Sequence, residues 1–143
     1  MMNDMKIQIA NEKHLSFLQE NDTHISKDFL ITKIQAEEIL IMEMNGNCIG
    51  WLRYNLFWDE IPFMNMLYFL EDYRQKGYGK ILVDYWEKVL MQKGHRRFLT
   101  STMANEDAQH FYRKMGYRDI GGFILPLEPL EIILMKDITL DAT

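Results

Sequence analysis

The clearest pattern in the chain is a pair of apolar segments on either side of Asn45-Gly46. Ile39–Met44 has the period of two that is typical of a strand, and Cys48–Phe57 follows as its returning partner. Asn-Gly between two apolar runs is among the strongest short-range signals for a β-hairpin, because both residues tolerate the left-handed backbone of a tight turn. The pattern therefore predicts an antiparallel strand pair joined by a turn at residues 45–47.

The segment before this hairpin predicts a strand and two helices. Lys6–Ala10 alternates apolar and polar positions, which favours a short strand. Asn11 is suited to cap a short helix, and a second helix is expected to begin near Ser26, with Phe29, Leu30 and Ile34 at helical spacing.

The segment after the hairpin predicts a strand, a long helix and then shorter elements. Phe63–Leu70, opened by Pro62, is apolar nearly throughout, so we expect a central strand. An amphipathic helix follows from about Gly77 to Lys93. The remaining predicted elements are a strand at Phe98–Thr102, a helix capped by Asn105 with Ala108, Phe111, Tyr112 and Met115 inward and ended by Gly116, and strands near Tyr117–Ile124 and Glu131–Ile138.

This order of elements predicts the fold class. A strand, a helix and a strand in succession form a right-handed crossover with the two strands parallel. We therefore expect a mixed α/β (α+β) fold: a central sheet of about six to seven strands, antiparallel early and parallel in the middle, flanked by about four helices. No repeat or linker interrupts the 143 residues, so one domain over residues 1–143 is predicted.

The turn from Arg74 to Lys80 is the segment most suggestive of chemistry. The chain leaves a buried strand and enters a helix across Gly77 and Gly79, which permit unusual torsions and close approach. The first amides of a helix lack internal acceptors and carry the positive end of its dipole. Arg74, Lys76 and Lys80 add positive charge, so this turn predicts an anion site whose length suits a pyrophosphate.

Two familiar phosphate-binding motifs fit the turn poorly. A P-loop needs Gly-x4-Gly-Lys-Ser/Thr, but here Lys80 is followed by Ile81. A dinucleotide fingerprint needs a third glycine where Leu82 stands, and it normally follows the first strand of a domain. Arg-x-x-Gly-x-Gly after a mid-chain strand is the pattern that remains.

That pattern, with Leu67 to Tyr73 before it, resembles the acetyl-CoA-binding motif of the GNAT superfamily of N-acetyltransferases. A second segment, Asn105 to Tyr117, is similar to the asparagine-to-tyrosine helix of the same superfamily and its Gly-aromatic turn. The resemblance extends from about Cys48 to Ile138. It implies a GNAT-like fold and an acetyl-CoA-dependent N-acetyltransferase, with acetyl-CoA as cosubstrate.

The resemblance also implies roles for individual positions. Main-chain groups of Phe69, Leu70 and Glu71 would pair with the pantetheine arm. Asn105 would hydrogen-bond the pantetheine region, and Tyr112 would protonate the departing thiolate; seven residues apart on one helix, these two would share a face. The pyrophosphate would be held by the amides of Gln75, Lys76, Gly77, Tyr78, Gly79 and Lys80, beside Arg74.

The reaction itself needs few other groups. An amine attacks the thioester carbonyl, and a backbone amide near Leu70 could stabilise the oxyanion. Asp59, Glu60, Glu71 or a water chain could accept the proton of the amine. Simpler interpretations stay open: Tyr112 as a core aromatic, Asn105 as an N-cap, and Asp59 and Glu60 as solvated loop charges.

Composition narrows the partners. A net charge of -5 argues against nucleic acid and is compatible with an amine substrate, either a small molecule or a peptide. The single cysteine, Cys48, and the lack of a long apolar run or a signal-peptide pattern favour a cytoplasmic protein without membrane contact. The four histidines show no ligand spacing, so no metal is expected.

Several questions stay open at this level. The acceptor amine cannot be identified from the sequence, and Pro126–Glu131 either borders its pocket or contributes to a homodimer. A CoA-binding regulatory module without turnover is the alternative function, and a nucleotide-binding protein is a third.

Overall fold

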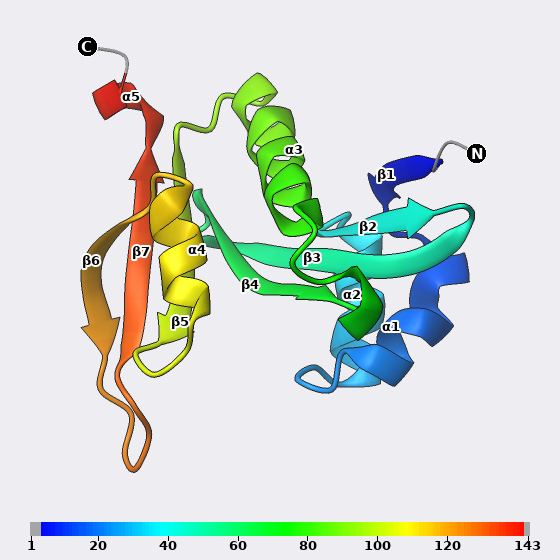
Figure 1. Cartoon of the computed structure of the whole chain (residues 1–143), viewed down its shortest axis with the longest axis horizontal. Coiled ribbons are helices and arrows are strands. Elements are labelled where there is room, and N and C mark those ends of the chain that lie inside the picture. The colour runs from blue at the N-terminus through cyan, green and yellow to red at the C-terminus, as the bar shows by residue number, and fades with distance from the viewer. Residues whose placement is uncertain (1–3, 142–143) are drawn as a thin grey trace. The chain divides into compact units, whose positions relative to one another are not determined.

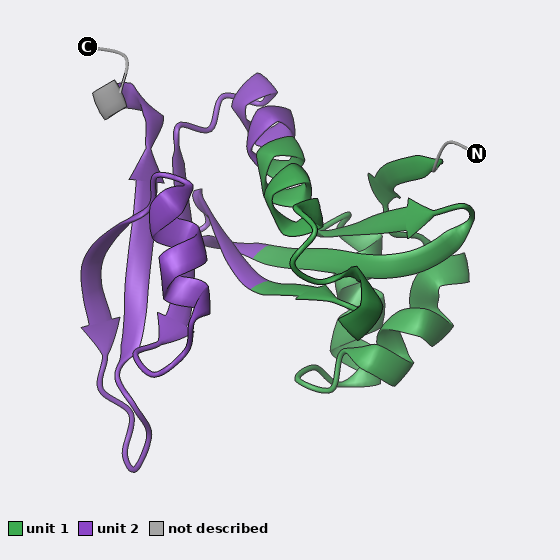
Figure 2. Ribbon diagram, in the orientation of Figure 1, with its two compact units in different colours: residues 1–54, 66–86 green, residues 55–65, 87–143 purple. Residues whose placement is uncertain are grey.

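The computed structural model describes residues 4–141, which form two compact units (Figure 2). Unit 1 comprises residues up to Tyr54 together with Met66–Trp86, and unit 2 comprises Asn55–Asn65 together with the residues from Glu87 onward. Strands β3 and β4 and helix α3 each begin in one unit and end in the other. The unit boundary therefore cuts through continuous elements and does not fall in a linker.

Unit 1 contains the elements of the N-terminal half (Figure 1). In chain order they are β1 (Met5–Ile9), the 3-10 helix η1 (Glu12–His14), α1 (Leu15–Asn21), α2 (Lys27–Gln35), β2 (Ile39–Met44), most of β3 (Asn47–Phe57), the end of β4 (Ile61–Phe69), the 3-10 helix η2 (Glu71–Tyr73) and the first part of α3 (Tyr78–Gln92).

Unit 2 contains the elements of the C-terminal half. They are the remaining parts of β3, β4 and α3, followed by β5 (Arg97–Met103), α4 (Ala108–Lys114), β6 (Arg118–Phe123), β7 (Glu131–Asp137) and α5 (Ile138–Asp141). None of the helices in the described part of the chain combines the length and the apolarity that crossing a bilayer demands.

Seven strands of the described chain form one sheet in the order β1-β2-β3-β4-β5-β7-β6. The pairs β1–β2, β2–β3, β5–β7 and β6–β7 are antiparallel. β4 and β5 are parallel, with Phe63 opposite Leu99. The predicted mixed sheet, antiparallel early and parallel in the middle, is confirmed.

Local turn and cap chemistry explains the N-terminal elements. Asn45 and Gly46 adopt φ values of 51° and 84°, the left-handed geometry expected of the hairpin turn. The Asn11 side chain accepts a hydrogen bond from the Lys13 amide at the start of η1. Ser26 caps α2 by accepting from the Phe29 amide at 3.3 Å, so both predicted helix starts are confirmed.

Each unit has its own buried core and contains a buried carboxylate with hydrogen-bond partners. In unit 1, Asp22 accepts hydrogen bonds from Arg53 at 2.9 Å and from the Trp51 indole at 3.2 Å. In unit 2, Glu87 accepts from the Tyr117 hydroxyl and from the Lys136 ammonium, both at 2.8 Å. These carboxylates are paired, as buried charges must be. Apolar core residues of unit 1 include Leu18, Leu30, Ile39, Ile41 and Trp51, and those of unit 2 include Ile61, Phe63 and Leu99.

One expectation about a helix face, that Ala108 points inward on α4, was wrong, and α2 carries an exposed aromatic residue. Phe29 lies on α2 but is 69% exposed, because Leu30 and Ile34 provide the buried face of this short helix. Ala108 is exposed at the start of α4, whereas Tyr112 and Met115 are buried as predicted.

Candidate functional site

The glycine turn connects β4 to α3 within unit 1. Phe69 ends the strand, η2 follows, and α3 begins at Tyr78. Two residues of the turn have left-handed backbone, Gln75 with φ 60° and Gly77 with φ 87°. Gly79 is helical and is not among the residues with positive φ. The torsional role predicted for Gly77 is therefore confirmed, whereas Gly79 has ordinary helical torsions, and its role in close approach stays a prediction.

The amides at the start of α3 have no internal acceptor. Ile81 is the first residue of the helix whose amide donates, to the Gly77 carbonyl at 3.2 Å. Among the described residues of unit 1, no acceptor receives a hydrogen bond from the amides of residues 75–80. Because these amides also lie at the positive end of the helix dipole, the turn can bind an anion through main-chain donors.

Two lysines surround these amides. Lys76 and Lys80 are exposed, and neither forms an ion pair with a described carboxylate of unit 1. Both ammonium groups are therefore available to an anion held at the turn.

Arg74 is positioned differently from the two lysines. Its Nε donates to the Phe69 carbonyl at 2.8 Å, and its guanidinium lies 4.8 Å from the centroid of the Tyr68 ring. These contacts tie the turn back to the end of β4. Arg74 therefore stabilises the turn through these two contacts, and its positive charge lies close to the turn.

The main-chain groups of residues 69–71 are largely occupied in this structure. The Leu70 amide donates to the Ile49 carbonyl at 2.9 Å, and the Leu70 carbonyl accepts from Tyr73 at 2.9 Å. The Glu71 carbonyl accepts from the Arg74 amide at 3.3 Å. The Leu70 amide is therefore not free to stabilise an oxyanion, because it is part of the sheet hydrogen bonding.

Packing behind the turn depends on a contact that the sequence analysis missed. A Cβ atom built on Gly50 of β3 would lie 2.4 Å from Cδ1 of Phe69, so the ring occupies the space above this glycine. Phe69 also stacks with Tyr78, the first residue of α3, with centroids 6.4 Å apart and planes at 25°. A glycine inside a strand pattern was the available signal, since such glycines mark close approach of another group.

Tyr112 lies on α4 in unit 2 and is buried, with 6% of its surface exposed. Its ring contacts Tyr117 edge-on, with centroids 5.8 Å apart. Burial raises the pKa of its hydroxyl to about 12; Glu106 contributes to the rise, and a hydrogen bond with Thr100 opposes it. The hydroxyl is therefore protonated at neutral pH and can donate a hydrogen bond.

The structure corrects the expectation for Asn105. α4 begins at Ala108 with Asp107 at the N-cap position, so Asn105 does not cap it. Asn105 is exposed in the turn after β5, where Gln109 donates to the carbonyls of Ala104 and Glu106. Because Asn105 precedes the helix, the argument that it shares a helix face with Tyr112 was wrong.

The three acidic candidates for the base are all exposed. Glu71 is in η2, next to the glycine turn. Asp59 and Glu60 instead belong to the turn before β4, so the whole strand separates them along the chain from Phe69. Glu60 lines a cavity of about 440 Å³ within unit 2, together with Trp58 and residues 94–97. Of the three, Glu71 is the one that unit 1 places beside the turn.

One cluster in unit 1 has the composition of a metal site but not its hydrogen bonding. His14, Glu43 and Cys48 bring one potential ligand atom each within 4.8 Å of one another. However, Nδ1 of His14 accepts a hydrogen bond from the Asn11 amide at 3.0 Å, which leaves the proton of the neutral ring on Nε2. A ligating histidine normally donates through its second nitrogen, so this ring is not oriented as a metal ligand.

Comparisons with known proteins agree with the fold. An uncharacterized N-acetyltransferase of Chlorobaculum tepidum is 26% identical over 83 residues, which cover 58% of this chain and 51% of that protein. The match thus spans about half the length of that curated relative. The N-acetyltransferase PaiA of Thermoplasma acidophilum, solved with coenzyme A, superposes with a TM-score of 0.77 at 17% identity, covering 94% of this chain and 99% of that chain.

A plant structure is similarly close. Naa50 of Arabidopsis thaliana, solved with the bisubstrate analogue CoA-Ac-MVNAL, has a TM-score of 0.79 at 19% identity and covers 93% of this chain and 98% of that chain. The model of the acetyltransferase (GNAT) family matches residues 7–117, which is well over half of the sequence. That match includes the glycine turn and α4, and the chain belongs to the acetyltransferase (GNAT) family.

Proposed function

We propose that the chain is an acetyl-CoA-dependent N-acetyltransferase that moves the acetyl group directly to a primary amine. The observation that carries the proposal is the row of amides at residues 75–80 without acceptors in unit 1, at the start of α3. A diphosphate bridges several such donors at once, which a single carboxylate cannot do. Membership of the acetyltransferase family and the coenzyme A complex of PaiA support the choice of coenzyme A as the ligand.

The lysines extend this site beyond the backbone. Lys76 and Lys80 flank the amides and would neutralise the charge of the diphosphate without displacing an existing ion pair of unit 1. The pantetheine arm would then run along residues 69–71, where the Phe69 carbonyl keeps a second lone pair beside the bond from Arg74. Coenzyme A would supply the activated acetyl thioester, and the remaining groups would orient it.

Tyr112 would act on the sulfur of the leaving group. With a pKa of about 12, its hydroxyl stays protonated and can donate a hydrogen bond to a developing thiolate. An ordinary thiol has a pKa of roughly 8.5, so complete transfer of the tyrosine proton would be uphill. Tyr112 would therefore stabilise the thiolate by donating a hydrogen bond, and the proton released by the amine would finally protonate the sulfur.

Glu71 or a water chain would first accept the proton that the attacking amine releases. Glu71 follows directly on the strand end that would carry the pantetheine arm. Asp59 and Glu60 are weaker candidates, because they precede β4 rather than follow it. An oxyanion donor other than the Leu70 amide is required, since that amide already donates to Ile49.

For the acceptor, the amine of a peptide or of a small molecule is proposed. The peptide-like analogue bound to the plant structure supports the former. We also propose a cytoplasmic location, because the only cysteine of the sequence, Cys48, is a half-buried free thiol. We propose a single catalytic domain, because β3, β4 and α3 are continuous across both units. The proposal also includes a homodimer, whose surface is argued in the next subsection.

The test combines binding and turnover. Titration calorimetry with coenzyme A should give micromolar or tighter binding, and Lys80→Glu should weaken it at least tenfold. Lys88→Glu is the matched control, because Lys88 is an exposed lysine of the same helix far from its first turn. Equal affinity of both variants and the unchanged chain would refute the site.

Release of free thiol from acetyl-CoA with a panel of amines then separates enzyme from binding module. Thiol release that depends on an amine supports the enzyme, whereas tight binding without release for every amine supports the regulatory module. Thermal shifts with ATP and NAD as large as that with coenzyme A would favour the nucleotide-binding alternative.

A further inference from the structure

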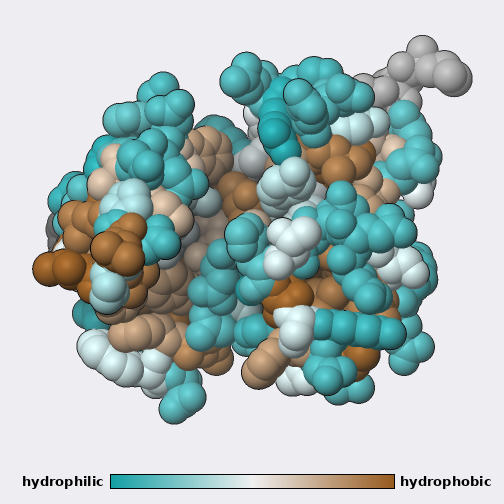
Figure 3. All heavy atoms as spheres, turned by 90° about the horizontal axis from the view of Figure 1, so that it is seen from below, coloured by the Kyte–Doolittle hydropathy of each residue, from teal (hydrophilic) through white to brown (hydrophobic). Residues whose placement is uncertain are grey.

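The hairpin between β6 and β7 exposes an apolar surface that lies outside the residues assigned to the proposed reaction. Six large apolar residues of this segment are each 45% or more exposed, with Ile124 at 91% and Leu127 at 106%. We name this surface the apolar tip; its residues are Ile120, Phe123, Ile124, Leu125, Leu127 and Leu130. Figure 3, which looks at the chain from below, shows the brown atoms gathered at the left over this hairpin.

The loop of the tip contains a tight turn with one strained residue. Glu128 donates its amide to the Leu125 carbonyl at 3.2 Å, which closes a turn with Pro126 and Leu127 in its two central positions. Leu127 has φ 64°, a backbone that leucine rarely adopts and that such turns usually reserve for glycine or asparagine. A leucine side chain that lies fully in solvent next to five other exposed apolar residues is typical of a surface that another molecule covers.

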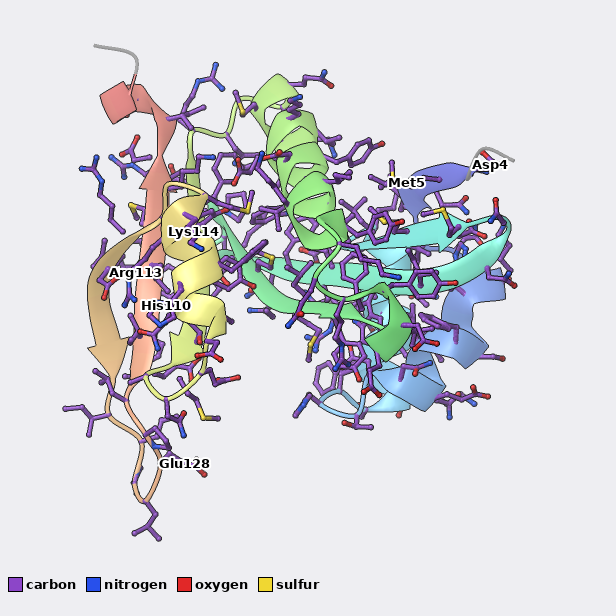
Figure 4. The ribbon with its side chains drawn as sticks, viewed as in Figure 1. Asp4, Met5, His110, Arg113, Lys114 and Glu128 are labelled. Carbon is purple, nitrogen blue, oxygen red and sulfur yellow. The ribbon has the colours of Figure 1, made fainter. Side chains whose placement is uncertain are left out.

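An ion pair connects the base of the hairpin to α4. Arg113 of α4, labelled in Figure 4, donates through Nε and Nη2 to the two carboxylate oxygens of Asp119 in β6, each at 2.9 Å. The pair is bidentate, and it links β6 to α4. β6 is also the last strand of the sheet order, and all six of its residues are exposed. Its outer edge is therefore open to another chain.

The size of the surface fits a dimer of identical chains. A fully exposed large apolar side chain offers roughly 150 Å² or more, so the six exposures correspond to on the order of 600 Å² per chain. Two such surfaces facing each other would bury about 1,200 Å², the lower end of the range for specific interfaces. An isologous contact joins the same patch on both copies, so an apolar surface meets its own equivalent without needing a separate complementary partner.

The charge of the segment argues against a lipid surface. From Asp119 to Glu131 the segment holds no lysine or arginine, and its ionisable groups are acidic. Glu128 stands at the tip itself, as Figure 4 shows. Segments that insert into membrane interfaces normally surround their apolar face with basic residues that attract anionic lipids. We therefore propose that the apolar tip is the interface of an isologous homodimer.

Sedimentation velocity from 5 to about 200 µM tests this surface. The unchanged chain should sediment as a dimer at the upper concentrations. Leu127→Glu and Ile124→Glu should each raise the dimer dissociation constant at least 100-fold, and Phe29→Glu should leave it unchanged. Phe29 is the matched control because it is 69% exposed but lies on α2, outside the tip. Because Glu128 of each copy carries the same charge, raising the salt concentration should strengthen the dimer.

Other results would overturn the proposal. The first is that the chain stays monomeric at every concentration. The second is that Leu127→Glu does not weaken the dimer. The third is that a monomeric chain binds phosphatidylserine vesicles through the apolar tip. A rise in the acceptor KM in Leu127→Glu without any change in mass would assign the tip to the substrate instead. Circular dichroism and the affinity for coenzyme A, measured on every variant, separate misfolding and failure of the cofactor site from failure of the dimer.

Discussion

Gly50 of β3 and Phe69 of β4 are in direct contact, with the phenyl ring lying where a side chain of residue 50 would begin. A Cβ atom at Gly50 would come within 2.4 Å of Cδ1 and 2.5 Å of Cε1 of Phe69. No rotation of the new methyl group can relieve this overlap, because Cβ is fixed to the backbone. The ring would have to move, and with it the strand end that leads into the glycine turn.

Gly50→Ala should therefore destabilise the fold and weaken the cofactor site together. Displacing a buried ring in a packed core costs typically 1–3 kcal/mol, so chemical denaturation should show a loss of about that size. The affinity for coenzyme A should fall by at least severalfold, because Phe69 also stacks on Tyr78 at the start of α3.

Gly121→Ala is the matched control for that measurement. Gly121 also lies in a strand, its φ is not positive, and a Cβ there would meet no atom within 4 Å. Its stability should stay within about 0.5 kcal/mol of the unchanged chain. An equal loss of stability in both variants would mean that the contact between Gly50 and Phe69 does not cause the destabilisation.

The contrast between the turn that precedes β3 and Gly50 within β3 shows what can be predicted from the sequence. The turn at Asn45 and Gly46 was predictable because its torsions depend on two adjacent residues. The contact of Gly50 with Phe69 joins residues that are distant in sequence, so only the sheet order could reveal it. A glycine in a strand signalled close approach but could not say what approaches.

The candidate site divides in the same way. The motif from Arg74 to Gly79 predicted the turn whose amides lack acceptors in unit 1, since its glycine and helix start act locally. The role of Arg74 was not predictable, because its partners, the Phe69 carbonyl and the Tyr68 ring, depend on how η2 folds back. The start of α4 was predicted too early, because Asn105 is a residue type that favours the N-cap position, whereas Asp107 occupies that position in the structure.

Gly79→Glu should abolish binding of coenzyme A without unfolding the chain. Gly79 is helical, so a side chain fits its torsions, but a carboxylate would occupy the anion site and repel the diphosphate. We expect at least a 100-fold loss of affinity by calorimetry.

Gly79→Ala provides the comparison. Alanine favours helix over glycine by up to about 1 kcal/mol, so this variant should be at least as stable as the unchanged chain. It should nevertheless bind coenzyme A more weakly if the ligand approaches the backbone closely. Normal affinity in the glutamate variant would remove the glycine turn as the binding site.

Tyr112→Phe should lower turnover about 10- to 100-fold while leaving coenzyme A affinity within a few fold. The reason is that the substitution removes only the hydroxyl that would donate to the thiolate. Because burial raises the pKa of Tyr112 to about 12, the rate of the unchanged enzyme should show no loss from tyrosine ionisation up to about pH 10. Thiol release under saturating acetyl-CoA measures both effects.

Tyr117→Phe controls for the loss of a buried hydroxyl. The Tyr117 hydroxyl donates to Glu87 at 2.8 Å, so its removal should reduce stability without changing the rate per folded molecule. Equal rates in Tyr112→Phe and the unchanged enzyme would show that solvent or another group serves the thiolate.

His14 should make the stability of the fold depend on pH below neutrality. Burial lowers the pKa of its imidazole from the ordinary value of 6.5, although Glu43, whose oxygen lies 3.8 Å from Nε2, opposes the shift. The unfolded chain therefore binds a proton at a higher pH than the folded chain does. The contribution of His14 to the free energy of unfolding is therefore fully present above about pH 6.5. It is lost as the pH falls below that value, and the free energy of unfolding decreases by at most about 1.4 kcal/mol per pH unit.

The structural reason lies in the cap of η1. Nδ1 of His14 accepts the Asn11 amide at 3.0 Å, and a proton on Nδ1 would replace that hydrogen bond with a contact between two donors. Urea denaturation from pH 7.5 to 5 should therefore show a steeper loss in the unchanged chain than in His14→Gln. His24→Gln, which alters an exposed histidine, should keep the steep loss. Identical pH profiles for the unchanged chain and His14→Gln would show that the buried imidazole does not set this dependence.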